Sequence, residues 1–308
     1  MTSAGITLKK ILLPTDFSEA SKQAFLPAVS LARQFSSSIT LVYVVSTTLP
    51  AELSHIGIVL EEKRLAREAE EALARVRAHE FPADIAVDAV VLGGGPYYEI
   101  GKAARSLASD LIVMSTHGYS GLKHTLLGST TERVVCHAPC PVLTLREQLV
   151  PVKFPDDTPC RFKNMLVPTD FSETSVKAIR YAAAFAGPCG AGMTLLHVVE
   201  PPDYPAWGYA HLPLRDEKLK KKARERLKAL ANEILPDQDA AVAVVTGDAA
   251  LRIVDTAKER NADLIVIATR GYRGLKHALL GSITAKVVRC AACPVLVVRE
   301  KEREFVAL

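Results

Sequence analysis

The chain lacks the features of membrane, secreted and nucleic-acid-binding proteins. No apolar run in its 308 residues is long enough to cross a bilayer. Residues 1–7 have no apolar segment of the kind a signal peptide carries. Six cysteines are too few for a disulfide scaffold, and a net charge of +4 with both signs interspersed gives little support for binding nucleic acid. We therefore expect a cytoplasmic protein with neither a membrane nor a nucleic-acid partner.

Several motifs of nucleotide-binding and hydrolytic enzymes are also missing. The sequence has no G-x-x-x-x-G-K-[ST] phosphate loop, no G-x-G-x-x-G after its first strand and no G-x-S-x-G elbow. His117 is replaced by Arg270 at the matching place later in the chain, so a repeated catalytic histidine is not supported. No side-chain pair suggests a nucleophile with its base. We predict no catalytic residue and, at most, slow hydrolysis of a bound nucleotide.

What the chain does have is an internal duplication. Residues 14–19 and 168–173 both read Pro-Thr-Asp-Phe-Ser-Glu. A second phrase, rich in glycine and ending in Gly-Ser, occurs at 118–129 and again at 271–282. Both phrases recur at nearly the same separation, which indicates that one unit was copied end to end.

The duplication predicts two domains, at 1–147 and 162–308. Pro151, Pro155 and Pro159 interrupt any regular element between them, so residues 148–161 are predicted to be a linker. Hydrophobic residues make up 49% of the chain and charged residues 23%, as in soluble globular proteins.

Strand and helix patterns alternate in both halves. A first helix, capped by Ser18, is expected to run on to Phe35 as one element. This alternation predicts two tandem Rossmann-like α/β domains, each a five-stranded parallel sheet with helices on both faces. The strands are expected at 10–14, 39–45, 85–92, 111–115 and 142–145, and at 165–167, 193–199, 241–245, 264–268 and 295–298.

The repeated phrases point to a ligand site at one edge of each sheet. Ligands of such folds bind beyond the carboxyl ends of the strands, where the strand order reverses. Asp16 follows the first strand, and the glycine phrase follows the fourth and leads into a helix at Ser129. The open amides and the dipole of a helix start attract phosphate. In the second half, Asp170 follows the first strand, and Gly281 and Ser282 stand at the corresponding helix start.

Other interpretations of these residues stay open at this point. The glycines could merely shape a loop, and Ser129 could merely cap a helix. Asp16 could cap the first helix, or it could contact a ribose hydroxyl, a ring amine or hydrated Mg²⁺. Five basic side chains of the loops either screen phosphate charge or face solvent: Lys123, His124, Arg273, Lys276 and His277.

Three further features have a structural interpretation that we favour. Cys290 and Cys293 follow a helix, where the dipole disfavours thiolate, so structural thiols are preferred over a redox pair. A metal site shared by Cys136, His137, Cys140, Cys290 and Cys293 is a further alternative. The basic stretch 218–228 has apolar residues at helical spacing, which indicates a solvated helix face rather than a basic binding patch. His197, whose counterpart is Tyr43, is expected to pack with its ring nitrogens hydrogen-bonded locally.

Taken together, the motifs resemble those of the universal stress protein family in its tandem two-domain form. The matching pieces are Pro14-Thr-Asp-Phe-Ser, Gly95-Pro-Tyr-Tyr-Glu-Ile, the phrase from Ser115 to Ser129, and Ala138-Pro-Cys-Pro-Val-Leu. The second half matches with Pro168-Thr-Asp-Phe-Ser, the phrase from Ala268 to Ser282, and Ala292-Cys-Pro-Val-Leu. The resemblance implies the strand order 3-2-1-4-5. It also implies that domains pair through their last strands, here 142–146 and 295–299, which would make the chain an internal pseudo-dimer.

One branch of this family binds ATP through the pattern G-x-x-G, nine residues, then G-[ST]. This chain departs from the pattern at its first glycine, where Ser115 and Ala268 stand. A side chain there could crowd the ligand or be forced to a positive φ. By position, the resemblance implies a nucleotide site made of Pro14, Asp16, Val44, Ser115, Gly118, Gly128, Ser129 and Thr130 in the first half, and of Pro168, Asp170, Val198, Ala268, Gly271, Gly281, Ser282, Ile283 and Thr284 in the second.

The leading hypothesis is a cytoplasmic stress-response protein that binds adenine nucleotide, as ATP with or without Mg²⁺, at one or both sites and acts as a sensor or regulator toward a protein partner. The alternative is a nucleotide-free interaction protein whose glycine loops are structural. A third hypothesis is an adenylating enzyme. It is disfavoured because Pro14-Thr-Asp-Phe-Ser stands where such enzymes carry a pyrophosphate loop.

Overall fold

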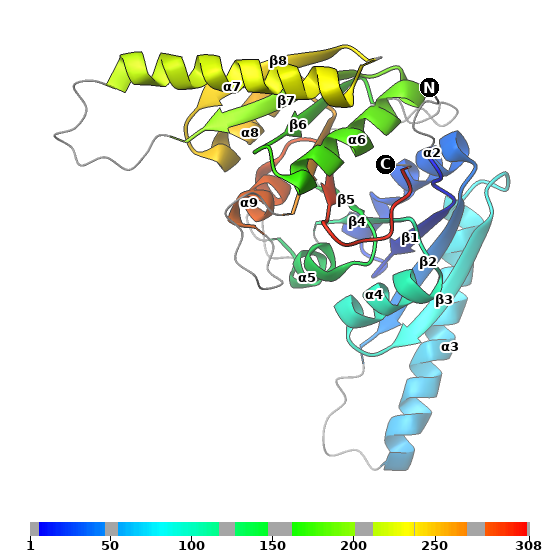
Figure 1. The fold of residues 1–308 in the computed structure, drawn as a ribbon. Coiled ribbons are helices and arrows are strands. Elements are labelled where there is room, and N and C mark those ends of the chain that lie inside the picture. The colour runs from blue at the N-terminus through cyan, green and yellow to red at the C-terminus, as the bar shows by residue number, and fades with distance from the viewer. Residues whose placement is uncertain are drawn as a thin grey trace. The chain divides into compact units, whose positions relative to one another are not determined.

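A computed structural model describes residues 6–46, 55–116, 127–146, 162–200, 212–236, 238–269 and 281–306 (Figure 1). The predicted linker 148–161 lies outside these residues. The chain divides into two compact units. One comprises Ile6–Cys160 together with Lys301–Phe305, and the other is built mainly on Arg161–Glu300.

The first unit is a five-stranded parallel sheet in the predicted order, β3-β2-β1-β4-β5. Strand β1 is central because Leu12 is registered with Thr40 on one side and Ile112 on the other. The strands are β1 (Lys10–Pro14), β2 (Ser38–Val45), β3 (Val87–Gly93), β4 (Leu111–Ser115) and β5 (Val142–Leu145). Strands β1, β4 and β5 begin and end at the predicted residues.

The helices of this unit are α1 (Glu19–Lys22), α2 (Phe25–Phe35), α3 (His55–Glu80), α4 (Pro96–Ser106) and α5 (Ser129–His137). Helices α2 and α3 pack against strands β1 to β3, whereas α4 packs beside α5 (Figure 1). Ile11, Leu12 and Leu13 of β1 are at most 1% exposed, which places the core on both faces of the central strand.

The second unit repeats this architecture, with the order β8-β7-β6-β9-β10. Its strands are β6 (Asn164–Pro168), β7 (Gly192–Val199), β8 (Ala240–Thr246), β9 (Leu264–Ala268) and β10 (Val295–Val298). Its helices are α6 (Glu173–Cys189), α7 (Leu212–Ile234), α8 (Ala249–Glu259) and α9 (Ser282–Cys290).

The first helix of the first unit corrects the prediction of a single element. The chain forms the short α1, passes through Gln23 and Ala24, and begins α2 at Phe25. Pro27 explains the interruption, because proline has no N–H to donate and its ring clashes with the preceding turn. The second unit has Tyr181 at the matching position, and there α6 is continuous.

Residues Lys301–Phe305 pack on the first unit, although the sequence boundaries assign them to the second domain. Arg303 donates from Nε to Oδ1 of Asp110 at 2.9 Å, and the backbone N of Thr7 donates to the carbonyl of Phe305 at 2.7 Å. The side chain of Phe305 is fully buried. Oδ2 of Asp110 accepts from the amides of Lys9 and Lys10, so this carboxylate joins the start of β1 to the end of the chain.

We predict that Arg303→Ala destabilises the first unit by about 1 kcal/mol, because a charge-assisted bond to a buried carboxylate is lost. Hydrogen exchange at the Lys10 amide, together with urea unfolding, measures the effect. Lys301→Ala is the control, since it removes an exposed cation from the same segment. Equal effects of the two variants would mean that the bond to Asp110 contributes nothing.

Candidate functional site

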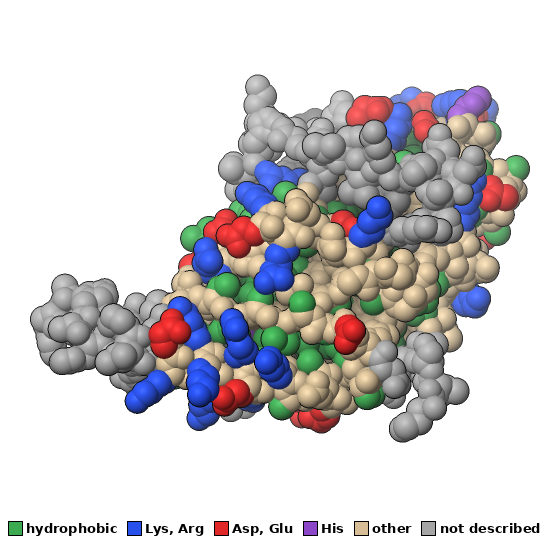
Figure 2. All heavy atoms as spheres, turned by 90° about the horizontal axis from the view of Figure 1, so that it is seen from above, with side chains coloured by type: hydrophobic (Ala, Val, Ile, Leu, Met, Phe, Trp, Pro, Cys, Tyr) green, Lys and Arg blue, Asp and Glu red, His purple; other side chains and the backbone are tan. Residues whose placement is uncertain are grey.

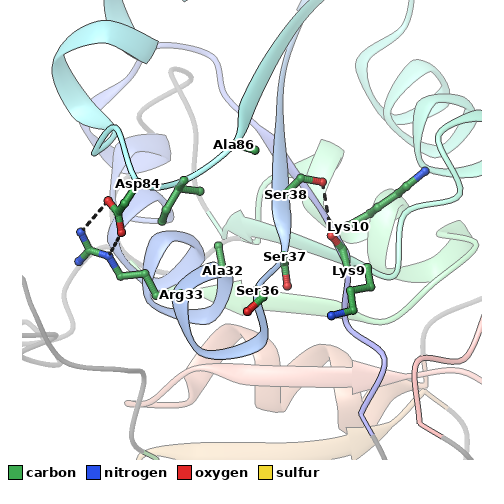
Figure 3. Close-up of a pocket in the computed structure, with 10 residues that line it drawn as sticks. Lys9, Lys10, Ala32, Arg33, Ser36, Ser37, Ser38, Asp84 and Ala86 are labelled. Atoms are coloured by element: carbon green, nitrogen blue, oxygen red, sulfur yellow. Dashed lines mark hydrogen bonds and ion pairs between the residues drawn. The ribbon is translucent and has the colours of Figure 1, made fainter.

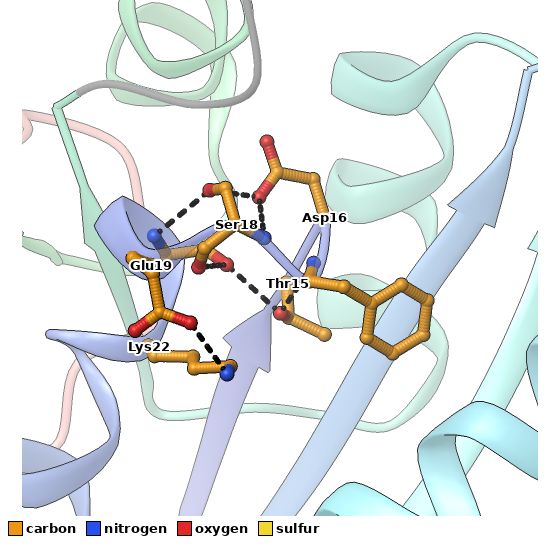
Figure 4. Close-up of polar contacts among 7 residues, drawn as sticks. Thr15, Asp16, Ser18, Glu19 and Lys22 are labelled. Atoms are coloured by element: carbon orange, nitrogen blue, oxygen red, sulfur yellow. Dashed lines mark hydrogen bonds and ion pairs between the residues drawn. The ribbon is translucent and has the colours of Figure 1, made fainter.

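The turn after β1 is organised by Asp16 and Ser18 (Figure 4). Ser18 is the residue that caps α1, because its Oγ accepts from the Ser21 amide at 3.1 Å. Asp16 supports this cap: its Oδ1 accepts from both the backbone N and the Oγ of Ser18. The other carboxylate oxygen of Asp16 points away from the turn (Figure 4). Ser18, rather than Asp16, therefore caps the helix directly.

The second unit builds the same turn from the same residue types. Oδ1 of Asp170 accepts from the amide and the Oγ of Ser172, at 3.1 and 2.6 Å. Ser172 in turn caps α6. Because the arrangement recurs in every contact, it is a property of the repeated phrase rather than of one domain.

A strained residue follows each aspartate, and the sequence reasoning missed it. Phe17 and Phe171 have φ values of 63° and 66°, in the left-handed region that a bulky residue rarely adopts. The amide of Phe17 donates to Oγ1 of Thr15 at 3.1 Å, and its ring lies 4.5 Å from that of Tyr43. These contacts hold the strained backbone in place and thereby fix the direction of the neighbouring aspartate.

Like α4, which begins after Gly95, the helices that follow β4 and β9 have no side-chain cap among the described residues. Helices α5 and α9 begin after Gly128 and Gly281, and no side chain caps either of them. By contrast, Ser18, Ser172 and Asp248 each cap a helix with a side-chain oxygen. The first-turn amides of α5 and α9 therefore lack a capping acceptor, which suits an anion.

The two glycines are required by a close backbone approach. The amide of Gly128 donates to the carbonyl of Thr116 at 2.9 Å, and that of Gly281 donates to the carbonyl of Thr269 at 3.0 Å. A Cβ on Gly128 would lie 3.1 Å from the Thr116 oxygen, and one on Gly281 would lie 2.8 Å from the Thr269 oxygen. These glycines make room for the chain's own backbone, which agrees with the interpretation that they shape the loop.

Threonines join the same helix starts to the strand ends. Thr131 donates its hydroxyl to the carbonyl of Ser115 at 2.9 Å, and Thr284 donates to the carbonyl of Ala268 at 2.7 Å. Both threonines are buried. The hydroxyl of Thr284, a residue of the implied nucleotide site, is thus directed to the backbone, and only its amide remains on the first turn of α9.

Ser115 and Ala268, which replace the first glycine of the ATP pattern, do not need a positive φ. They are the last residues of β4 and β9, in extended backbone that any residue adopts, and they are 6% and 7% exposed. The conformational part of the expected conflict is therefore absent at both positions.

The residues of the expected site that the structure describes lie at the carboxyl edge of each sheet. Asp16 and Ser129 follow β1 and β4, which are neighbours, and Asp170 and Ser282 follow the neighbours β6 and β9. Ser129, Ser282 and Ile283 are exposed at the helix starts. Pro14 and Pro168 end β1 and β6, Val44 and Val198 lie near the ends of β2 and β7, and Thr130 lies in the first turn of α5. Gly118, Gly271, His117, Arg270 and the five basic loop residues lie outside the described part of the chain.

A cavity of about 590 Å³ lies at the opposite edge of the first sheet, by the amino ends of β1 and β2 (Figure 3). Its charged groups already have protein partners. Arg33 makes two bonds to Asp84, at 2.9 and 3.2 Å, and lowers the pKa of that carboxyl. Lys10 donates from Nζ to the carbonyl of Leu107 at 3.0 Å. We therefore regard this cavity as part of the scaffold.

Comparison with known proteins agrees with this geometry. The model of the universal stress protein family matches residues 7–146 and 161–299. The chain belongs to this family. Two such repeats confirm the tandem form, and some relatives of this universal stress protein correspond to a single repeat.

One of these relatives is a universal stress protein of Methanocaldococcus jannaschii, 38% identical over 143 residues, which are 45% of this chain and 82% of that protein. Another is a universal stress protein of Bacillus subtilis, 35% identical over 147 residues, which are 45% of this chain and 99% of that protein. The crystal structure of a universal stress protein from Archaeoglobus fulgidus is similar over 94% of this chain and 98% of its own, with a TM-score of 0.66 and 25% identity.

Several side chains of this universal stress protein have structural roles. His197 Nδ1 is 2.8 Å from the carbonyl of Thr169, which confirms the expected local hydrogen bond. The described residues include no group of three or more His, Cys, Asp or Glu that could hold a metal ion, so the alternative of a shared metal finds no support there. Nor does any helix within the described ranges have the length and apolar character needed to cross a membrane.

Cys290 and Cys293 of the second repeat are free thiols, and burial disfavours ionisation of Cys293. Cys290 is the last residue of α9, and Cys293 is 7% exposed. Burial, with a smaller contribution from Asp263, raises the pKa of the Cys293 thiol to about 12. This favours structural thiols over a redox pair, because a reactive pair needs a thiolate near neutral pH.

We predict that Gly281→Ala destabilises the second repeat more than Gly128→Ala destabilises the first. The methyl group would approach the Thr269 oxygen to 2.8 Å but the Thr116 oxygen only to 3.1 Å, and the backbone must shift in the first case. We expect a loss of about 2 kcal/mol for Gly281→Ala and about half that for Gly128→Ala, measured by urea unfolding. Equal losses would contradict the difference in approach.

We also predict that iodoacetamide at pH 8 labels Cys290 well before Cys293. With a pKa of about 12, the Cys293 thiol stays protonated at this pH, and burial further restricts access. Peptide mass spectrometry over a time course measures both rates in the same sample. Urea-unfolded protein is the control, in which the two rates should converge.

Proposed function

We propose that this universal stress protein binds adenine nucleotide, as ATP, at the carboxyl edge of one or both repeats, and that it acts in the cytoplasm as a sensor or regulator for a protein partner. The observation that carries the proposal is the uncapped helix start beside an aspartate turn, present in both repeats. A helix that leaves its first amides open at a sheet edge is suited to phosphate.

The residues present fit a nucleotide laid across the strand ends. The first-turn amides of α5, from Ser129 onward, would hold the phosphates, and the exposed hydroxyl of Ser129 adds a donor. The nucleoside would then extend toward Asp16, which follows the neighbouring strand, and toward Val44. Mg²⁺ would arrive with the phosphates, because it needs only one or two protein carboxylates and keeps several waters.

A binding role suits the site better than catalysis. Asp16 and Asp170 are held by hydrogen bonds within their own turns. A general base must reach the water that attacks the phosphate. The phosphates would lie at the starts of α5 and α9, whereas the two aspartates lie in the turns after β1 and β6. Bound ATP would therefore be hydrolysed slowly, and occupancy of the site would be the signal that a partner detects.

A nucleotide-free interaction protein remains the second candidate, because one observation favours it. Gly128 and Gly281 are needed for the backbone approach whether or not a ligand binds. Their presence alone therefore does not require a nucleotide. Under either candidate, we propose that the two repeats pair through their last strands, as the family resemblance implies.

We predict that Ser129→Glu and Ser282→Glu each remove one nucleotide site and that the double variant removes both. Glutamate at the first position of a helix is compatible with its dipole, whereas its carboxylate repels phosphate. Isothermal titration with ATP should give a stoichiometry that falls with each substitution. We expect affinity at the altered site to fall at least about tenfold, because like charges meet at short range.

Ser129→Gln and Ser282→Gln are the matched controls, since they add similar bulk without charge. Nucleotide released from the purified, denatured wild-type protein gives an independent readout. If the wild-type protein retains no nucleotide and gives no heat with millimolar ATP, the proposed site fails and the nucleotide-free candidate stands.

A further inference from the structure

The two repeats differ at one side chain beside the aspartate turn. In the second repeat, the guanidinium of Arg226, from α7, lies 4.1 Å above the ring of Phe171. Phe171 directly follows Asp170, and its ring lies 4.6 Å from that of His197 on β7. Arg226, Phe171 and His197 thus form a stack of three side chains at the residue that directly follows Asp170.

The first repeat has the lower part of this stack, but among its described residues no cation lies over the ring of Phe17. Phe17 lies on Tyr43, as Phe171 lies on His197. Leu73 of α3 and Leu227 of α7 are matching core residues, because each is buried and each lies the same number of positions before a buried residue that is followed by proline, Phe81 or Leu235. The residue before Leu73 is Ala72, so the first repeat has alanine where the second has Arg226.

Arg226 is available to a ligand. Its side chain is exposed, and its contact with Phe171 is made through the face of the guanidinium. Within the described ranges, no carboxylate forms an ion pair with it. Arg226 is one of several exposed Lys and Arg residues along α7, and Figure 2 shows basic side chains gathered on the surface with acidic ones among them. A guanidinium stacked by its face keeps the N–H groups of its edge free to donate in a planar fork.

The place of Arg226 indicates which part of a nucleotide it would meet. Phosphates on the amides of α9 lie above β9, and the strands next in order are β6, which leads to Asp170, and β7, which carries His197. Two strand spacings amount to about 10 Å. A nucleotide anchored at α9 and laid across the edge therefore brings its base, rather than its phosphates, to Asp170 and Arg226.

The two groups together match one purine better than the other. A carboxylate accepts from ring or exocyclic N–H groups, which both adenine and guanine offer. An arginine fork needs two adjacent acceptors, and guanine presents O6 and N7, whereas adenine presents a donor amine beside N7. The first repeat, with Asp16 and Ala72, lacks that donor fork.

We propose that Arg226 is a base-specificity residue, through which the second repeat accepts guanine nucleotides in preference to the first. This inference rests on the proposed nucleotide site. The two repeats of one chain would then bind different purine nucleotides. The occupancy of the two sites together would depend on the concentrations of both adenine and guanine nucleotides.

The test isolates each repeat in the full chain. Ser129→Glu leaves the second site and Ser282→Glu leaves the first, and GTP and ATP are titrated into each by calorimetry. We expect the ratio of GTP to ATP affinity to be at least about fivefold higher in the Ser129→Glu protein. Adding Arg226→Ala to it should abolish that difference. Arg226→Lys, which keeps the charge but lacks the fork, should do the same.

Arg224→Ala is the matched control, because it removes an exposed arginine from the same helix without touching Phe171, and it should leave the ratio unchanged. Ala72→Arg in the Ser282→Glu protein should raise GTP affinity at the first site. Equal ratios in the two single-site proteins, or equal effects of Arg226→Ala and Arg224→Ala, would overturn the assignment. A uniform loss of ATP and GTP binding in Arg226→Ala would also overturn it, since Arg226 would then contact phosphate. If the wild-type protein binds no nucleotide at all, the proposed function itself fails.

Discussion

The site in each repeat depends on one close contact between a strand end and a helix start. The carbonyl of Thr116 accepts from the amide of Gly128, and Thr269 does the same for Gly281. A buried threonine one turn into each helix binds the preceding strand residue, Ser115 or Ala268. The two ends of the intervening loop are thereby fixed to one another by hydrogen bonds that do not involve the loop itself. An anion meeting the helix start finds its amides already positioned, which reduces the entropy lost on binding.

This contact also explains why the sequence identified the important glycine positions but did not reveal why glycine is needed there. The repeated Gly-Ser correctly marked a helix start, because glycine followed by a good helix-forming run is a local signal. A Cβ at either glycine would lie closest to a carbonyl oxygen at the end of the preceding strand, more than ten residues earlier in the chain. Only the folded chain shows that oxygen. Similarly, Ser115 and Ala268 looked unfavourable in the pattern, yet they are ordinary strand residues.

The strands were predictable because their apolar runs are bounded by polar or proline residues, and β1, β4 and β5 were placed without error. The strand order came from the family resemblance and not from the runs themselves. The division of the first helix was missed because its apolar period continues across Pro27, although the missing N–H does break the ladder. The binding of Arg303 to Asp110 could not be predicted, because the two residues are far apart in sequence and neither belongs to a recognisable motif.

A duplicated chain provides its own comparison, because features that both repeats keep are those that the fold cannot easily lose. Both repeats keep the strained phenylalanine, at a cost of about 1–2 kcal/mol in a position where glycine would be free of strain. The contact of the ring with Tyr43 or His197 is a stabilising interaction that offsets this cost. The residues around this shared frame have diverged: Tyr43 against His197, and Ala72 against Arg226. Because the strained turn aims its aspartate in the same way in both repeats, a difference in ligand preference has to arise from these neighbours. Under the proposed function, the shared frame would supply a common mode of binding, and the side chains around it would supply the difference between the two sites.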